Sequence, residues 1–228
     1  MELNADFSKR ALVHGGRIDW VASPMPGVDR RMLDRIGGEV ARATTIVRYA
    51  PGSHFSPHVH TGGEEFLVLE GVFQDEHGDF PAGSYVRNPP ETRHTPASEP
   101  GCVILVKLWQ FDLQDRTEVR IRTGTRERAF ESASGRPGVD LLPLHADMRE
   151  VVRLETWSPN AEIELRAEGG IELFVLDGSF TEGGEGFERW SWLRLPEGAP
   201  LNARAGADGA QVWLKSGHLP YATAPARG

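Results

Sequence analysis

The chain has 228 residues, of which 39% are hydrophobic and 25% are charged, the balance of an ordinary globular protein with room for one large or two small domains. Acidic residues outnumber basic residues by 33 to 25, and the resulting net charge of −8 argues against direct binding of nucleic acid. Cys102 is the only cysteine, which excludes an intrachain disulfide, and neither a signal peptide nor a membrane-length apolar run is present, so we expect a cytoplasmic protein without a membrane partner.

Glycine (26 residues) and proline (16 residues) divide the chain into short runs rich in Val, Leu, Ile and aromatic side chains. This pattern predicts an all-β protein with many short strands, as in a sandwich or barrel. One modest helical pattern lies at residues 30–35. In the first half, strands are expected at residues 43–49, 65–70, 84–88 and 102–111. In the second half, they are expected at residues 150–157, 171–176, 190–195 and 211–216.

Four side chains that can bind a metal follow one another in the first half: His58, His60, Glu64 and His94. His58 and His60 are two residues apart on an extended segment, so their imidazoles point to the same face. Glu64 follows a short turn and can fold back over that face, while His94 belongs to a second strand pair that must close against the first. Three neutral imidazoles and a carboxylate suit Zn, Fe, Mn, Ni or Co. We therefore predict one divalent metal ion per chain.

The two halves of the sequence resemble each other. The run Phe66-Leu-Val-Leu-Glu-Gly71 recurs as Leu173-Phe-Val-Leu-Asp-Gly178, and five such matches occur in the same order with offsets of 107 to 111 residues. This order indicates a tandem duplication rather than chance. We expect a metal-binding first domain at residues 1–122, a linker at residues 123–136 and a second domain at residues 137–228.

The second copy is expected to lack the metal site. On the alignment of the two copies, with one residue deleted from the turn, the four ligand positions become Arg166, Glu168, Ile171 and Leu201. This set cannot hold a divalent ion. The second domain is therefore expected to be structural, or to provide a surface for a homodimer or another partner.

The two ligand blocks resemble the two motifs of the cupins. The first motif, with His-x-His and Glu between two glycines, matches Gly52, His58, His60, Glu64 and Gly71. The second motif, Pro-x-Gly followed by histidine, matches Pro81, Gly83 and His94. The resemblance implies a bicupin, that is, two tandem double-stranded β-helix (jelly-roll) domains with a metal inside the first barrel.

A closer resemblance is to the cupin domain of ChrR-type anti-sigma factors, and it rests on residues 65–73 (EFLVLEGVF), 75–79 (DEHGD) and 81–90 (PAGSYVRNPP). In that family the residues matching the four ligands bind zinc, so zinc is the expected metal, with Fe, Mn and Ni as alternatives. Proteins of that family bind their sigma factor through a separate helical zinc domain with one His and two Cys. This chain opens almost directly into the cupin and has no second cysteine, so sigma-factor binding by that route is not expected.

Two functions follow from the resemblance. The first is a sensory or regulatory metal-binding module, linked to transcription, with an unidentified small-molecule effector. The alternative is a non-haem metal-dependent dioxygenase for a small diketone or hydroxyketone, because an octahedral metal would leave about two positions open. A closed tetrahedral zinc would instead be structural. No acid–base pair in the sequence names a reaction, so no catalytic residue is assigned.

Several polar and aromatic side chains near the motifs are candidates to line the barrel: Gln74, Tyr85, Arg87 and Trp109. Arg87 recurs as Arg194 in the copy without ligands, which favours a structural role for both arginines. Glu65 is expected to face away from Glu64, because side chains alternate along a strand.

Overall fold

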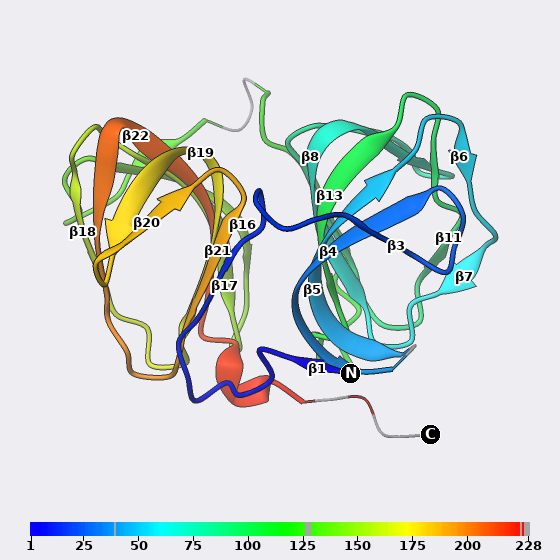
Figure 1. The fold of residues 1–228 in the computed structure, drawn as a ribbon, viewed down its shortest axis with the longest axis horizontal. Coiled ribbons are helices and arrows are strands. Elements are labelled where there is room, and N and C mark those ends of the chain that lie inside the picture. Colours follow the sequence, from blue (N-terminus) through cyan, green and yellow to red (C-terminus); the bar gives the residue numbers. More distant parts are fainter. Residues whose placement is uncertain (39, 126–128, 224, 226–228) are drawn as a thin grey trace. The chain divides into compact units, whose positions relative to one another are not determined.

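The structure, a computed structural model, describes residues 1–38, 40–125, 129–223 and 225. Apart from one short 3-10 helix, η1 (Leu219–Tyr221), the regular structure within these residues is β-strand (Figure 1). The prediction of an all-β protein is confirmed. The helical pattern at residues 30–35 was misleading, because these residues lie inside the strand β4 (Val28–Gly37), where a register shift between Met32 and Asp34 interrupts the strand alternation. No helix among the described residues is long and apolar enough to cross a membrane.

The described chain divides into two compact units. Unit 1 contains Met1–Ala5, Asp19–Thr125 and the described residues from Thr223 on, while unit 2 contains Asp6–Ile18 and the described residues between Arg126 and Ala222. These units differ from the contiguous domains expected from the repeat, since an N-terminal segment is built into unit 2. Residues 126–128 of the expected linker lie outside the described residues, and two residues in its second half form a strand, Glu131–Ser132.

Unit 1 is built on one large antiparallel sheet, with strand order β1-β4-β5-β13-β8-β10-β14. These strands are β1 (Glu2–Leu3), β4 (Val28–Gly37), β5 (Ala41–Tyr49), β8 (Glu64–Asp75), β10 (Ser84–Asn88), β13 (Cys102–Leu108) and β14 (Val119–Arg122). Short strands complete the unit: β3 (Val21–Ala22), β6 (Ser53–His54), β7 (His58–Val59), β9 (Gly78–Pro81), β11 (Arg93–His94) and β12 (Ala97–Ser98). Strands β7 and β11 form a separate two-stranded ladder at one edge of unit 1 (Figure 1).

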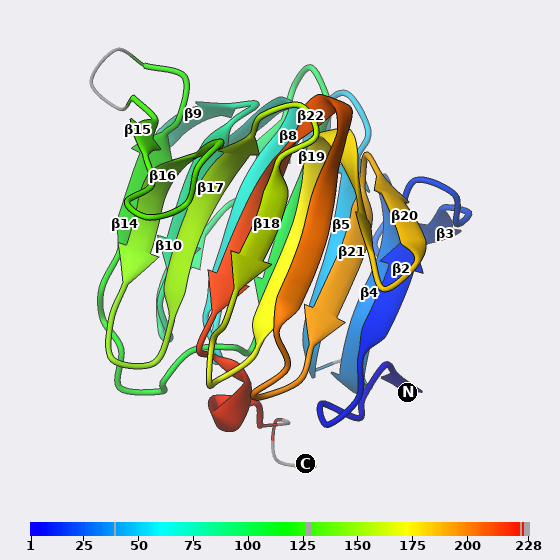
Figure 2. The same cartoon turned by 90° about the vertical axis from the view of Figure 1, so that its left-hand side faces the viewer.

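Unit 2 repeats the plan with strand order β15-β16-β17-β22-β19-β21-β2. Its strands are β2 (Ala11–His14), β15 (Glu131–Ser132), β16 (Val139–Ala146), β17 (Val151–Trp157), β18 (Glu162–Leu165), β19 (Ile171–Glu182), β20 (Glu185–Glu188), β21 (Ser191–Leu195) and β22 (Leu201–Ser216). The edge strand β2 comes from the N-terminal segment and lies beside β21 (Figure 2). Arg10, in the same N-terminal segment, forms an ion pair with Glu182 on β19 at 2.7 Å.

Each unit has its own apolar core on the inner face of its strands. In unit 1 the core includes Phe66, Phe73 and Ile104, and in unit 2 it includes Leu173, Phe180 and Val212. These side chains alternate with residues of the opposite face, as the period of a strand requires. Glu64, a residue of the first motif, is the first residue of β8, and the core residues Phe66 and Phe73 follow it on the same strand.

Gly71 and Gly178 show why the repeat keeps a glycine at this point of β8 and β19. Their φ angles are +71° and +68°, in the left-handed region that glycine adopts most readily. A Cβ atom at Gly71 would also collide with the carbonyl of Gly101, and one at Gly178 with the carbonyl of Gly209. The glycine of the first motif is therefore a scaffold residue, required in both units.

Candidate metal centre

The four predicted ligand residues come together at one place in unit 1. His58 on β7 pairs directly with His94 on β11, so the two imidazoles start from facing positions. His60 follows β7, and its backbone N–H donates to the carbonyl of Thr92 at 2.9 Å, which ties it to the β11 side. Glu64 opens β8 after the Gly62–Gly63 turn. The local ladder and the turn together bring the side chains into one cluster.

The distances within this cluster are short. Nε2 of His60 lies 2.9 Å from Nε2 of His94, and Oε2 of Glu64 lies 3.4 Å from the former and 3.6 Å from the latter. The ring of His58 lies 4.7 Å from that of His60, centroid to centroid. One ring nitrogen from each of the three histidines falls within 4.8 Å of the others. The three imidazoles therefore form one cluster, and the carboxylate of Glu64 lies beside two of them.

Burial differs among the four side chains. His60, Glu64 and His94 are buried, whereas His58 is exposed. The amide of Asn88 donates to Oε2 of Glu64 at 3.3 Å, which holds the carboxylate from the next strand. A buried group of two imidazoles and one carboxylate with a third imidazole at the surface is suited to a divalent ion that remains accessible from one side.

The pKa values of the two buried histidines move in opposite directions. Burial, joined by the charges of His94 and His58, lowers the pKa of His60, although Glu64 opposes the shift. Burial also acts to lower the pKa of His94, but Asp75, Glu64 and Glu76 outweigh it and raise that pKa. His60 is thus a neutral donor at neutral pH, as metal ligation requires.

Asp75 is a site residue that sequence reasoning missed. Its Oδ2 lies 3.2 Å from Nδ1 of His94. The neighbouring carboxylate of Glu76 accepts from the backbone N–H of Thr95 at 2.8 Å, so the β8–β9 hairpin holds both His94 and the residue that follows it. Asp75 and Glu76 lie in a segment that the sequence singled out only as a resemblance. No spacing rule connects a hairpin carboxylate to a histidine nineteen residues away.

Two of the candidate barrel-lining residues face the other way. Arg87 pairs with Glu65 across β10 and β8, on the face opposite Glu64. Its guanidinium binds Asp115 at 2.9 Å, and the hydroxyl of Tyr85 donates to Glu65 at 2.7 Å. Strand alternation directs both side chains away from the cluster, as expected for Glu65 itself. The other two candidates have local roles, since Gln74 bonds to Asp79 and Trp109 packs over Gly62.

The strand register corrects the alignment of the second copy. Leu165 pairs with Leu201 on β18 and β22, as His58 pairs with His94 on β7 and β11. The Gly-Gly turn is intact in both units, so no residue is deleted there. The positions matching the four ligands are therefore Leu165, Ala167, Ile171 and Leu201, rather than a set that includes Arg166 and Glu168. All four pack in or against the apolar core of unit 2.

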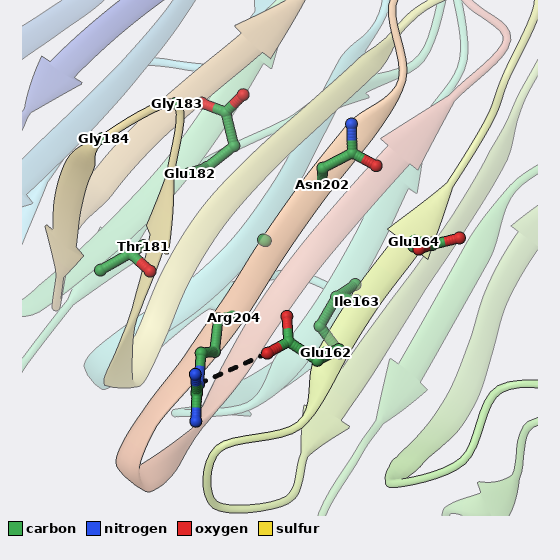
Figure 3. Close-up of a pocket in the computed structure, with 10 residues that line it drawn as sticks. Glu162, Ile163, Glu164, Thr181, Glu182, Gly183, Gly184, Asn202 and Arg204 are labelled. Atoms are coloured by element: carbon green, nitrogen blue, oxygen red, sulfur yellow. Dashed lines mark ion pairs between the residues drawn. The ribbon is translucent and has the colours of Figure 1, made fainter.

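Unit 2 does have a surface depression of about 450 Å³, between β18, β22 and the β19–β20 hairpin (Figure 3). Its polar walls include Glu162 and Arg204, which form an ion pair at 3.5 Å, and Glu182, which is held by Arg10. Glu162 and Glu182 are thus already paired with arginines. Within the described residues, the histidine cluster of unit 1 is the group with metal-ligand geometry.

Solved structures share this fold across nearly the whole chain. A candidate dioxygenase from Nostoc punctiforme superposes with a TM-score of 0.72 at 14% identity, covering 97% of this chain and 87% of the other. Protein YlbA from Escherichia coli gives 0.68 at 14% identity, covering 92% of each chain. The bacterial pirin YhhW from Escherichia coli, solved with nickel(II), gives 0.62 at 15% identity, covering 92% of this chain and 99% of the other. At such identities the likeness shows the fold.

The two similar jelly-roll units give the chain a bicupin fold, and the first unit carries both motifs and the histidine cluster. More particularly, residues 8–112 match the family model described as the ChrR cupin-like domain. The resemblance drawn from the motifs is thereby confirmed. A comparison with curated proteins gave no match.

Proposed function

We propose that unit 1 is a sensory or regulatory module that holds one divalent metal ion, zinc, through His58, His60, Glu64 and His94. The observation that carries this proposal is the cluster of three imidazoles, with the carboxylate of Glu64 beside those of His60 and His94. Nitrogen and oxygen donors of these types are ordinary zinc ligands. Residues 8–112 match the ChrR cupin-like domain, and the choice of zinc and of a regulatory role rests on the resemblance to ChrR-type anti-sigma factors.

The exposed side of the cluster is the place where an effector would act. His58 faces solvent, and it pairs directly with the buried His94 across the β7–β11 ladder. A small molecule or oxidant that displaced the His58 side chain would therefore disturb a ladder of only two short strands. Such a local change of packing is the kind of event that switches a protein between two states.

Elemental analysis of the protein purified without chelator tests this proposal. We expect about one zinc per chain in the wild type, and severe loss of zinc in the His94→Ala variant. A wild-type protein that is folded and carries no divalent metal, even after incubation with zinc, would contradict it.

A second candidate function is that of a metal-dependent dioxygenase for a small diketone or hydroxyketone. The exposure of His58 favours it, because a site reached by solvent on one side can admit a substrate. The likeness to a candidate dioxygenase supports the same function at the level of fold. When bound, iron would supply Lewis-acid and oxygen chemistry at this cluster. Oxygen consumption by the Fe(II)-loaded protein with acetylacetone would favour the enzyme, whereas zinc at full occupancy with no such activity would favour the regulator.

A further inference from the structure

Arg30 lies on the inner face of unit 1. It pairs with Val47 across β4 and β5, and Val47 belongs to the apolar core together with Val28, two residues before Arg30. Residues on either side of Arg30 face outward, since Asp29 forms an ion pair with Arg48 and Arg31 stacks on Trp20. Because strand side chains alternate, Arg30 lies on the core-facing side of β4, where it is half-buried.

The charge of Arg30 is not neutralised by the residues that the structure describes. Its Nε atom is buried without a hydrogen bond, and none of those residues forms an ion pair with the guanidinium. Arg35, on the same face of β4, adds a second guanidinium, which donates to the carbonyl of Gly38. Burial, together with the charge of Arg30, lowers the pKa of Arg35. Two uncompensated positive charges on an inner wall favour an anion between them.

Tyr49 places a hydroxyl beside Arg30. Tyr49 pairs with Val28, so it is a diagonal neighbour of Arg30 in the ladder, at roughly 7–8 Å between backbone positions and within reach of an arginine side chain. Its ring packs against Phe73 at 6.0 Å, and Phe73 lies 5.7 Å from the ring of His94. Burial, with the charge of Glu64, raises the pKa of the phenol, which therefore remains a donor. Within the described chain its hydroxyl has no hydrogen-bond partner.

Unit 2 provides an internal control for these two residues. By register, Val28–Tyr49 corresponds to Val139–Trp157, so Arg30 is matched by Leu141 and Tyr49 by Trp157. The arginines in that corner of unit 2 are paired, since Arg136 and Arg153 bind Glu155 at 2.8 and 2.7 Å. Arg87 and Arg194, in contrast, recur in both units. Arg30 and Tyr49 are thus present in unit 1 alone, like the metal-ligand residues and unlike the scaffold residues that both units share.

We propose that Arg30 and Tyr49 form an anion-binding subsite inside unit 1, which holds the carboxylate of a small organic acid whose other end reaches the histidine cluster. A guanidinium matches a carboxylate with two parallel hydrogen bonds, and the phenol can donate a third. The apolar surroundings of Val28, Val47 and Phe55 favour a small monoanion over a phosphate dianion, which would need more donors. The part of this proposal that involves the cluster rests on the proposed metal function.

Two related probes test the subsite: acetoacetate, a β-keto acid, and acetylacetone, which has a methyl ketone in place of the carboxylate. Binding of each is measured by isothermal titration calorimetry with the zinc-loaded protein. We expect Arg30→Gln to weaken acetoacetate binding by roughly ten- to a hundredfold, the size of one charge-assisted hydrogen bond, and to leave acetylacetone binding unchanged. Arg31→Gln, on the opposite face of the same strand, should leave both unchanged.

Tyr49→Phe serves as a second variant, because it removes a single hydroxyl and keeps the packing against Phe55 and Phe73. We expect it to weaken acetoacetate binding several-fold, whether or not Arg30→Gln folds. The proposal is overturned if the wild type shows no preference for acetoacetate over acetylacetone, or if Arg30→Gln and Tyr49→Phe both retain that preference in full.

Metal content measured in the same samples separates the two proposals. A wild type without metal would contradict the proposed function. The Arg30-dependent preference for the carboxylate should nevertheless persist in chelator-treated protein, with weaker binding of both probes. If a wild-type protein with about one zinc per chain shows no preference for acetoacetate, the proposed subsite is contradicted and the proposed metal module is not.

Discussion

Oδ2 of Asp75 lies 3.2 Å from Nδ1 of His94, and both side chains are only 2% exposed. Because Asp75 occupies one nitrogen of the imidazole, the other nitrogen is directed to His60 and Glu64. The carboxylate therefore orients the ring and selects the tautomer that presents Nε2 to a metal.

Asp75→Asn should weaken metal binding by about 10- to 100-fold, because the amide orients His94 less strongly and does not raise its basicity. Competition with a chromogenic chelator measures the affinity. Asp79→Asn is a matched control in the same hairpin, since Asp79 bonds to Gln74 and not to a histidine. Equal affinities of wild type and Asp75→Asn would show that Asp75 does not position His94.

His94→Ala and Leu201→Ala change matching positions of the two units and should have opposite effects. His94→Ala should remove most of the metal. Leu201→Ala should leave about one metal per chain but lower the free energy of unfolding by roughly 2–5 kcal/mol, because Leu201 is fully buried in the core of unit 2. Elemental analysis and urea unfolding separate the two outcomes. Two metals per wild-type chain would refute the assignment of unit 2 as metal-free.

Glu155 should make the stability of unit 2 sensitive to acid. Burial by itself acts to raise the pKa of Glu155, but Arg136, Arg153 and the indole N–H of Trp157 outweigh it and hold the pKa below the ordinary value of 4.5. A carboxyl whose folded-state pKa is depressed contributes stability above its unfolded pKa and loses it as the pH falls through the folded pKa. Glu155→Gln should therefore be less stable at neutral pH, by roughly 3 kcal/mol, and lose less stability on acidification.

Urea unfolding at a series of pH values measures this effect. Glu162→Gln is the control, because the pair between Glu162 and Arg204 is exposed and should change stability by less than about 1 kcal/mol. An equally steep acid dependence in Glu155→Gln and wild type would show that other carboxyls are responsible.

Leu12→Ala should destabilise unit 2, although residue 12 precedes all of the metal motif. Leu12 on β2 packs against the core of unit 2 and pairs with Leu193. Because Leu12 is only partly buried, we expect a loss of roughly 1–3 kcal/mol. Lys9→Ala, at an exposed position of the same segment, is the control. Metal content should stay at the wild-type level in both variants, and a loss of metal in Leu12→Ala would mean that β2 serves unit 1.

The grouping of His58, His60 and Glu64 could be predicted because its determinants are local. His58 and His60 are fixed by strand alternation, and Glu64 follows them across a turn of three residues. The fold class was equally accessible, since two copies of one strand pattern recur in order. Local spacing and a repeat are the signals that a single sequence carries most clearly.

Long-range register was not accessible in the same way. Asp75, Arg30 and Tyr49 reach the interior of unit 1 from separate strands, and nothing in their spacing relates them to His94. The alignment of the two copies matched Arg166 to His58, whereas the strand register matches Leu165 to His58. This difference of one residue matters, because a one-residue shift moves every side chain of a strand to the other face. The segment at residues 6–18 likewise joins a unit whose other strands lie more than 100 residues further along the chain.

That segment has a consequence for folding on the ribosome. Ala11 pairs with Arg194, so the strand synthesised near the start has to wait for a partner synthesised near the end. The strands of unit 1 that lie between residues 19 and 125 all emerge in the meantime and can pair with one another. Closure of unit 2 is thus a late, long-range event, and until it occurs the edge of β21 is open to pairing with another chain.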